Sequence, residues 1–346
     1  MGPVPYPCVP RNPAGLGTGP TYRDGMTRFG YTLMTEQSGP RELVDYAVGA
    51  ERAGYDFLVS SDHYSPWLTS QGHAPYAWTV LGAVAYATTD IELMTYVTCP
   101  TIRYHPAVVA QKAATLQLLS DGRFTLGLGS GENLNEHVVG EGWPAVHARQ
   151  DMLVEAIEII RALHTGDLVT YDGEYFRVDS ARVWDAPEGG VPIGVAVSGE
   201  HSVERFAPLG DHLITTEPEA DLIRGWDEHH EGVSRKIGQI PISWDPDKDA
   251  AIARAHDQFR WFAGGWAVNS DLPTPAGFAG ASQFVRPDDV ADSIACGPDL
   301  DELAESARPF IDAGFTDVAI VQVGDAQQQR FVDEVAGPLL EKLRAL

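Results

Sequence analysis

The chain has 346 residues, 44% of them hydrophobic, which suits one large α/β barrel and argues against a disordered chain. Asp and Glu number 49 against 24 Lys and Arg, and the net charge of −25 disfavours binding to nucleic acid or to an anionic membrane. The three cysteines Cys8, Cys99 and Cys296 are too far apart for a zinc ribbon or disulfide scaffold, and no apolar run could span a membrane. We expect a soluble cytoplasmic enzyme that acts on a small molecule.

Residues 1–25 differ from the rest of the chain. They are rich in Pro and Gly, show no periodicity and lack the apolar stretch of a signal peptide. We interpret them as a disordered leader, with Met26 as an alternative start. Residues 26–346 are expected to form a single domain.

From residue 27 on, apolar strand-like segments alternate with segments of helical periodicity. Helices are expected between the early strands and near 148–164 and 202–210, and the D-G dipeptide within 169–178 predicts a small hairpin. The eight expected strands cover residues 28–34, 55–63, 91–100, 123–132, 191–199, 211–217, 237–244 and 316–324.

Eight strand–helix alternations predict a parallel sheet closed into a (β/α)8 barrel, with an open doubly wound sheet as the alternative. Several strands are continuously apolar, as strands covered on both faces must be. Residues 262–286 are rich in Gly, Pro and Ala without a clear period. We interpret them as an insertion or lid over the mouth of the barrel.

Catalytic residues of such barrels lie where strands run into the following loops. Asp62 and His63 stand at the expected end of the second strand, and a histidine there can move protons near neutral pH. Asp62 could accept hydrogen bonds from a ligand, and Trp67 offers an aromatic wall. The alternative is that Asp62 caps the loop and His63 is an ordinary hydrogen-bonded surface residue. The polar residues of 95–106 suit either a ligand-facing surface or a simple strand end.

The segment 127–137 carries three glycines that let a ligand approach the backbone, followed by Glu132 and Asn135. Its spacing does not match the dinucleotide-binding fingerprint. Ser198 and Gly199 begin an expected helix whose free N–H groups suit a phosphate, although an ordinary Ser N-cap is the commoner case. Metal ligation and a triad hydrolase are disfavoured, because neither H-E-x-x-H nor G-x-S-x-G occurs.

Taken together, six segments resemble the deazaflavin (coenzyme F420)-dependent glucose-6-phosphate dehydrogenases of the luciferase-like monooxygenase superfamily. The segments are EQSGPRELVDYAVGAERAG, SDHYSPW, GHAP, TYVTCPTIRYHPAVVAQ, GLGSGENLNE and VPIGVAVSG. The resemblance covers nearly everything from Thr27 onward. It implies the barrel, the F420 cofactor, hydride transfer between an alcohol or sugar hemiacetal carbon and the deazaflavin ring, and a homodimer.

The resemblance also implies residue roles. His63 would be the acid/base for the substrate hydroxyl, Glu132 would handle a proton at the reduced edge of the ring, and Trp67 would pack against the substrate. Thr216 matches a substrate-contacting threonine, and Tyr96–Val97 matches a non-prolyl cis peptide behind the ring. The positions matching cofactor contacts are Asp62, Tyr96, Val97, Cys99, Ser130, Gly131, Asn135, Ser198, Gly199, His201 and Ser202.

The chain departs from that group where the group holds a substrate phosphate. Glu219 stands at the position of one lysine, with Glu217 and Asp221 beside it, and the position of an arginine falls near Ser293. Carboxylates facing a phosphate dianion would be repulsive. We therefore predict a neutral alcohol or unphosphorylated sugar rather than glucose 6-phosphate, unless an arginine such as Arg205 or Arg224 binds the phosphate.

Two further functions stay open at this point. The first is a flavin (FMN)-dependent monooxygenase of the same superfamily, and the second is a non-catalytic F420-binding protein on the same barrel. The SDH…W and GENLNE segments favour the deazaflavin enzyme over the first. The presence of both His63 and Glu132 argues against the second.

Overall fold

The computed structural model describes residues 26–346, so the predicted leader lies outside the described residues. Within them, eight parallel strands form a closed barrel, because β1 pairs with both β2 and β11 and the last gap is closed by pairing of β8 with β9. The predicted (β/α)8 barrel is confirmed and the open sheet is excluded. The barrel strands are β1 Arg28–Leu33, β2 Phe57–Ser60, β3 Glu92–Thr95, β4 Phe124–Leu128, β7 Ile193–Ala196, β8 His212–Ile214, β9 Lys236–Ser243 and β11 Asp317–Gln322.

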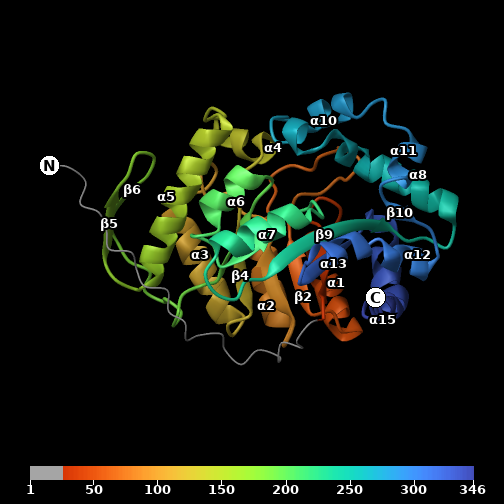
Figure 1. The fold of residues 1–346 in the computed structure, drawn as a ribbon, viewed down its shortest axis with the longest axis horizontal. Helices are drawn as coiled ribbons and strands as arrows, with labels where there is room; N and C mark the ends of the chain where they lie inside the picture. Colours follow the sequence, from red (N-terminus) through yellow and green to blue (C-terminus); the bar gives the residue numbers. More distant parts are fainter. Residues whose placement is uncertain (1–25) are drawn as a thin grey trace.

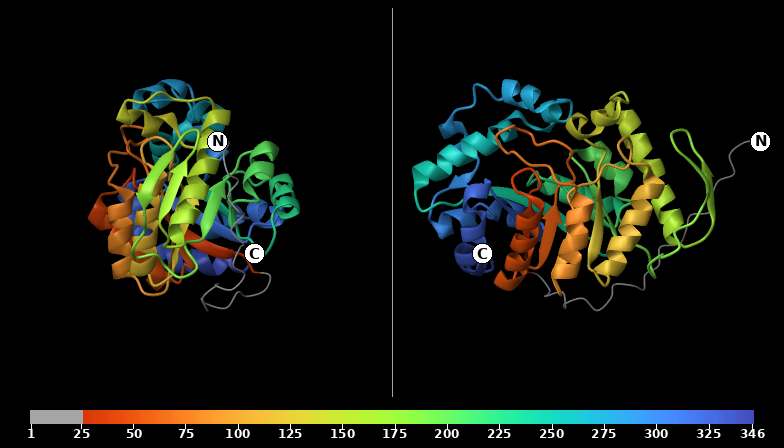
Figure 2. Two further views of the ribbon diagram at one scale, coloured as in Figure 1. Left: turned by 90° about the vertical axis from the view of Figure 1, so that its left-hand side faces the viewer. Right: turned by 180° about the vertical axis from the view of Figure 1, so that it is seen from behind.

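Helices surround the barrel, and α1, α2 and α3 lie side by side over neighbouring strands (Figure 1, Figure 2). The α1 helix ends at Gly54, whose φ of 93° is left-handed and whose N–H bonds to Ala50 and Glu51 carbonyls, a conformation that favours glycine. The larger helices are α1 Pro40–Ala53, α2 Ala77–Ala87, α3 Pro106–Leu119, α5 Val146–His164, α6 Glu200–Phe206, α7 Ala220–His229, α8 Lys248–Phe259 and α15 Ala336–Leu343. Shorter ones are α4 Asn133–Glu136, α11 Pro287–Ala291, α12 Leu300–Glu305, α13 Arg308–Ala313 and α14 Gln328–Arg330.

The barrel interior is filled at its amino-terminal end. Buried side chains from four strands pack there, namely Phe57, Val59, Met94, Ile237 and Ala319, and Ile214 at the end of β8 borders both this cluster and the cavity above it. At the same end the Arg235 guanidinium joins Asp317 at 2.6 Å and Glu92 at 2.7 Å. This plug leaves the carboxyl ends of the strands as the place for a site, as in other barrels of this kind.

Two local details of the sheets differ from the prediction. A two-residue strand, β10 Ala295–Cys296, pairs with β9 outside the barrel ring. The expected hairpin exists as β5 Val169–Asp172 and β6 Arg177–Ala181, and it projects beyond α5 (Figure 1). Asp172 pairs with Arg177, so four residues connect the strands rather than a two-residue D-G turn.

The segment interpreted as a lid contains short helices rather than irregular chain. They are η2 Arg260–Gly264, α9 Trp266–Asn269 and α10 Pro275–Ala281. In Figure 2 the cyan-to-blue part of this segment lies at the same end of the barrel as the olive α4. No described helix is both long and apolar enough to cross a membrane.

Candidate active site

A cavity of about 460 Å³ lies at the carboxyl ends of the barrel strands, bordered by residues that follow β2, β3, β4, β7 and β8 and by residues 259–269. It brings together most of the residues predicted from the sequence. Gly199 and His201 do not line it. The predicted residues that do are Asp62, His63, Trp67, Tyr96, Val97, Cys99, Ser130, Gly131, Glu132, Asn135, Ser198, Ser202 and Thr216.

His63 stands between two carboxylates. Its Nδ1 lies 2.7 Å from Glu36 Oε1, and its Nε2 lies 3.7 Å from Glu132 Oε2. Glu36 lies three residues after the end of β1 and is fully buried. Its other carboxylate oxygen accepts a hydrogen bond from Ser61 Oγ at 2.8 Å. The carboxylate of Glu36 therefore fixes the imidazole through Nδ1 and leaves Nε2 directed toward Glu132 and the cavity.

Burial and the neighbouring charges shift the pKa values of His63 and Glu132. Burial alone lowers the pKa of His63, but the charge and hydrogen bond of Glu36 and the charge of Glu132 outweigh it and raise that pKa above its ordinary value. Burial raises the pKa of Glu132, although His63 acts in the opposite direction. The imidazole and the Glu132 carboxyl can therefore exchange protons closer to neutral pH than two isolated groups.

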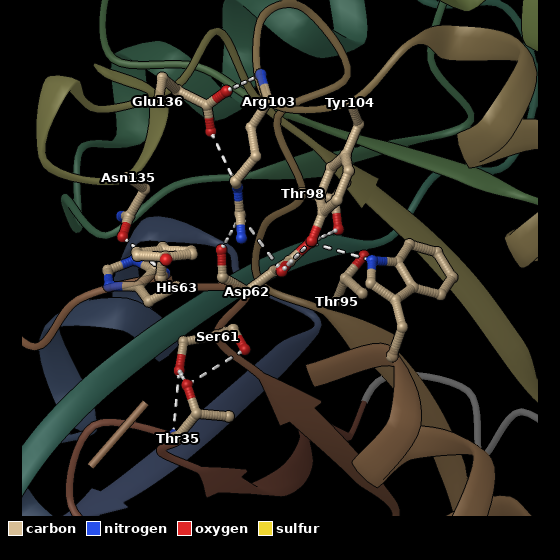
Figure 3. A network of polar contacts seen from close by, with 12 residues as sticks. Thr35, Ser61, Asp62, His63, Thr95, Thr98, Arg103, Tyr104, Asn135 and Glu136 are labelled. Carbon is tan, nitrogen blue, oxygen red and sulfur yellow. Dashed lines mark hydrogen bonds and ion pairs between the residues drawn. The ribbon is translucent and has the colours of Figure 1, made fainter. Parts of the chain in front are cut away.

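Asp62 is the centre of a buried polar network behind His63 (Figure 3). One carboxylate oxygen accepts hydrogen bonds from Trp78 Nε1 at 3.0 Å and Thr98 Oγ1 at 2.8 Å. The other accepts from Arg103 Nη2 at 3.2 Å and Tyr104 OH at 3.1 Å. A carboxylate has about four acceptor positions, so protein donors already fill those of Asp62. Its geometry favours a role in holding the loop that carries His63 over direct acceptance of a ligand hydrogen bond.

The segments after β3 and β4 lie against each other on one side of the cavity. The Tyr96–Val97 peptide bond is cis, at the position that the resemblance implies. A Cβ on Gly129 would come within 2.7 Å of Val97 Cγ2, and one on Gly131, whose φ is +88°, within 2.6 Å of Cys99 Sγ. Both glycines are thus required for this close packing. Burial raises the pKa of the Cys99 thiol, which contacts Thr101 Oγ1 at 3.0 Å.

The beginning of α6 presents backbone donors. Ser202 Oγ accepts hydrogen bonds from the N–H groups of Ser198 at 3.1 Å and Gly199 at 3.2 Å, and it donates to Gly199 O at 2.7 Å. This arrangement fixes the turn. The N–H groups of Glu200 and His201 in the first helical turn have no partner within the helix and suit an anionic oxygen.

An aromatic wall covers the other side of the cavity. The Trp67 ring lies 4.4 Å from the His63 ring and stacks on Trp261 at 4.0 Å with an interplanar angle of 14°. Phe259 and Phe262 pack against Trp261 at 5.2 Å and 6.0 Å. All of these aromatic side chains line the cavity.

The cavity is acidic. Among the described residues that line it there are four carboxylates, Asp62, Glu132, Glu136 and Glu217, and no lysine or arginine. Glu219 is exposed at the residue before α7 and does not line the cavity, whereas Glu217 does.

The three other positions discussed for phosphate binding lie outside the cavity lining as well. Ser293 donates a hydrogen bond to Asp289 O at the end of α11. Arg205 pairs with Asp151 and Arg224 with Asp221. Neither arginine is therefore placed to bind a phosphate in the cavity. Within residues 26–346, no cluster of three or more His, Cys, Asp or Glu side chains could hold a metal ion.

The sequence reasoning missed Glu36 and Trp261. Glu36 follows the first strand just as Asp62 and His63 follow the second, so its position at a strand end was a usable signal. Trp261 lies one residue before the stretch interpreted as a lid, and no periodicity marks it as facing the cavity.

Comparisons with known proteins identify the family of the chain. The family model described as Luciferase-like monooxygenase matches residues 26–317. Two relatives, each described as F420-dependent glucose-6-phosphate dehydrogenase, come from Nakamurella multipartita and Nocardia farcinica. Both are 36% identical to this chain, covering 92% and 93% of it and 97% and 99% of their own lengths.

Solved structures show the same fold. One described as an F420-dependent secondary alcohol dehydrogenase in complex with an F420-acetone adduct has a TM-score of 0.83 at 29% identity, covering 92% of this chain and 99% of that one. A coenzyme F420-dependent tetrahydromethanopterin reductase from Methanopyrus kandleri has a TM-score of 0.72 at 18% identity, with 92% and 99% covered, and supports the fold alone. With its barrel, its cis peptide and this match over most of its length, the chain belongs to the luciferase-like monooxygenase family.

Proposed function

We propose that the protein is an F420-dependent dehydrogenase or reductase that acts on the CH–OH group of a neutral alcohol or sugar, in either direction. The observation that carries the proposal is the Glu36–His63–Glu132 arrangement at the cavity. Relatives at 36% identity bear the name of F420-dependent dehydrogenases, which supports the cofactor.

The residues present fit this cofactor. The N–H groups at the start of α6 suit its phosphate-bearing arm, with Ser198, Gly199, His201 and Ser202 as the holding segment. The segments around Tyr96–Val97 and Ser130–Gly131 pack against each other and together line one side of the cavity, where a flat ring would lie. Cys99 and Asn135 lie beside these segments, and Asn135 Nδ2 reaches Glu132 at 3.3 Å.

When bound, F420 supplies a ring carbon that accepts or returns a hydride. His63 Nε2 takes the proton from the substrate hydroxyl during oxidation and gives it back during reduction. Glu36 holds the imidazole through Nδ1 and stabilises the imidazolium that forms. Glu132, whose carboxyl retains its proton to higher pH because of burial, would supply the proton that the reduced ring takes up and would accept it back when the ring is oxidised again.

The charge of the cavity supports a neutral substrate. Glu217 beside Thr216 lines the cavity, and no lysine or arginine among the described lining residues could balance a phosphate dianion. Repulsion between these charges holds at any effective dielectric constant. We therefore expect glucose 6-phosphate to be a poor substrate. We propose Thr216, which lines the cavity, as a substrate contact.

The test is to mix purified protein with oxidised F420 and neutral or phosphorylated alcohols and sugars, and to follow the loss of cofactor absorbance. Reduction by a neutral substrate supports the proposal. Bound FMN with oxygen consumption would support a monooxygenase instead, and F420 binding without turnover by any substrate would support a non-catalytic binding protein.

We propose in addition that the chain forms a homodimer through α2 and α3. These neighbouring helices expose four apolar side chains, Tyr86, Val108, Leu118 and Leu119. Light scattering during size-exclusion chromatography would test this, since Leu119→Glu should shift a dimer toward monomer. The cytoplasmic location stays a prediction from the sequence.

A further inference from the structure

We propose that the substrate is an alcohol, or its carbonyl counterpart, that carries an apolar and preferably aromatic substituent. This inference rests on the proposed function and names the substrate class of the same site. In the oxidative direction the carbinol C–H bond breaks, its hydride passes to F420, and the hydroxyl proton passes to His63. The carbonyl compound is the product.

The aromatic wall lies beside His63, which favours an apolar substituent next to the reacting hydroxyl. The Trp67 ring lies 4.4 Å from the imidazole in an edge-on contact, and Trp261 stacks on Trp67. A hydroxyl that reaches Nε2 therefore places its neighbouring carbon atoms beside indole surface. Phe262 and Trp266, which line the cavity while 36% and 46% exposed, extend the apolar surface further.

Many polar groups of the cavity already form hydrogen bonds with one another, which disfavours a substrate with many hydroxyl groups. Gln239 Nε2 donates to Thr32 Oγ1 at 3.0 Å, and Tyr96 OH donates to Thr215 O at 3.3 Å. Asn269 Nδ2 donates to Trp261 O at 3.2 Å. A sugar would bury several hydroxyl groups that need partners, and each unpaired one is costly. Within the described residues the indole N–H of Trp261 is a buried donor of the lining without a hydrogen-bond partner. The lining therefore offers few free partners, which favours a substrate with few hydroxyl groups over a sugar.

The charge of the cavity disfavours an anionic substrate. Glu217 repels a carboxylate or phosphate on the substrate, and the described lining residues include no lysine or arginine to attract one. The aromatic wall, the paired polar groups and Glu217 together favour a neutral and apolar compound over a sugar and over an anion.

The first experiment measures kcat/KM for F420 reduction by the full-length protein with 2-propanol, 2-butanol, 2-hexanol, 1-phenylethanol and glucose. We expect kcat/KM to rise about threefold to fourfold per methylene group that becomes buried, with glucose below 2-propanol. A flat series, or glucose above 1-phenylethanol, would overturn the inference and leave the dehydrogenase intact. No reduction of F420 by any member would overturn the proposed function itself.

The second experiment assigns the preference to the aromatic wall. Trp261→Ala and Phe262→Ala should each lower kcat/KM for 1-phenylethanol about tenfold relative to 2-propanol, with F420 affinity unchanged. Trp184→Ala is the matched control, since that indole is 80% exposed and does not line the cavity. Equal losses with both alcohols in both variants would contradict selection by this wall. The Phe262 variant keeps the test valid if Trp261→Ala does not fold.

Discussion

The contact between Glu36 and His63 gives the sharpest prediction, tested by Glu36→Gln. The change keeps the shape of the side chain but removes a fully buried charge 2.7 Å from Nδ1. At an effective dielectric constant of 20, the attraction of two unit charges at that separation is about 6 kcal/mol, before the desolvation of both groups is subtracted. Net values for hydrogen bonds to charged groups are about 1.5–3 kcal/mol, so we expect kcat to fall about 10- to 150-fold.

The pH dependence of the same variant distinguishes this role from a purely structural one. Glu36 raises the pKa of His63, and alcohol oxidation needs the neutral imidazole as proton acceptor. The rising limb of kcat/KM with pH should therefore move to lower pH in Glu36→Gln, because burial then dominates. The control is Glu42→Gln, an exposed carboxylate on α1. An unchanged profile and an unchanged kcat in Glu36→Gln would refute the reasoning.

Three further changes test other parts of the site. Glu217→Lys should raise the kcat/KM ratio of glucose 6-phosphate to a neutral alcohol about tenfold or more, and Glu219→Lys, which lies outside the cavity, should raise it less; equal effects would contradict the placement of Glu217. Asp62→Asn leaves Arg103 buried without its main counter-charge and should cost about 3–5 kcal/mol in urea unfolding, whereas exposed Asp45→Asn should cost little. Lys112 Nζ lies 3.4 Å from the Tyr104 ring centroid without a hydrogen-bond partner among residues 26–346, and burial lowers its pKa to about 8. The folded state therefore disfavours the charged amine, and wild-type stability should increase as pH rises from about 8 toward 10.5. Lys112→Met should raise Tm at pH 7 but not at pH 11, and a lower Tm at pH 7 would show that the cation–π contacts outweigh burial.

The barrel and one half of the site were predictable because their signals are local. Continuous apolar runs separated by helical periodicity indicate covered parallel strands. Asp62 and His63 follow the second of these runs directly, and the carboxyl ends of parallel strands meet at one end of a barrel. Strand alternation alone thus predicts that His63 lies at the same end of the barrel as the glycine-rich segment that contains Glu132.

The other half depends on contacts between distant segments. Glu36 becomes significant only because β1 and β2 are neighbours and its carboxylate reaches across to His63. Whether Glu217 or Glu219 faces the cavity depends on the path of the chain between β8 and α7, which alternation does not determine. Trp261 meets Trp67 across about 190 positions of sequence, through a segment without periodicity.

The central claim is tested most directly by the reduction of oxidised F420 with 1-phenylethanol, measured for the wild-type protein and for His63→Asn. The account predicts loss of the cofactor absorbance with the wild type, and retained cofactor binding with little or no reduction in the variant. A variant that reduces F420 as fast as the wild type would contradict the role of His63. A wild-type protein that does not bind F420 but carries FMN would contradict the proposed function.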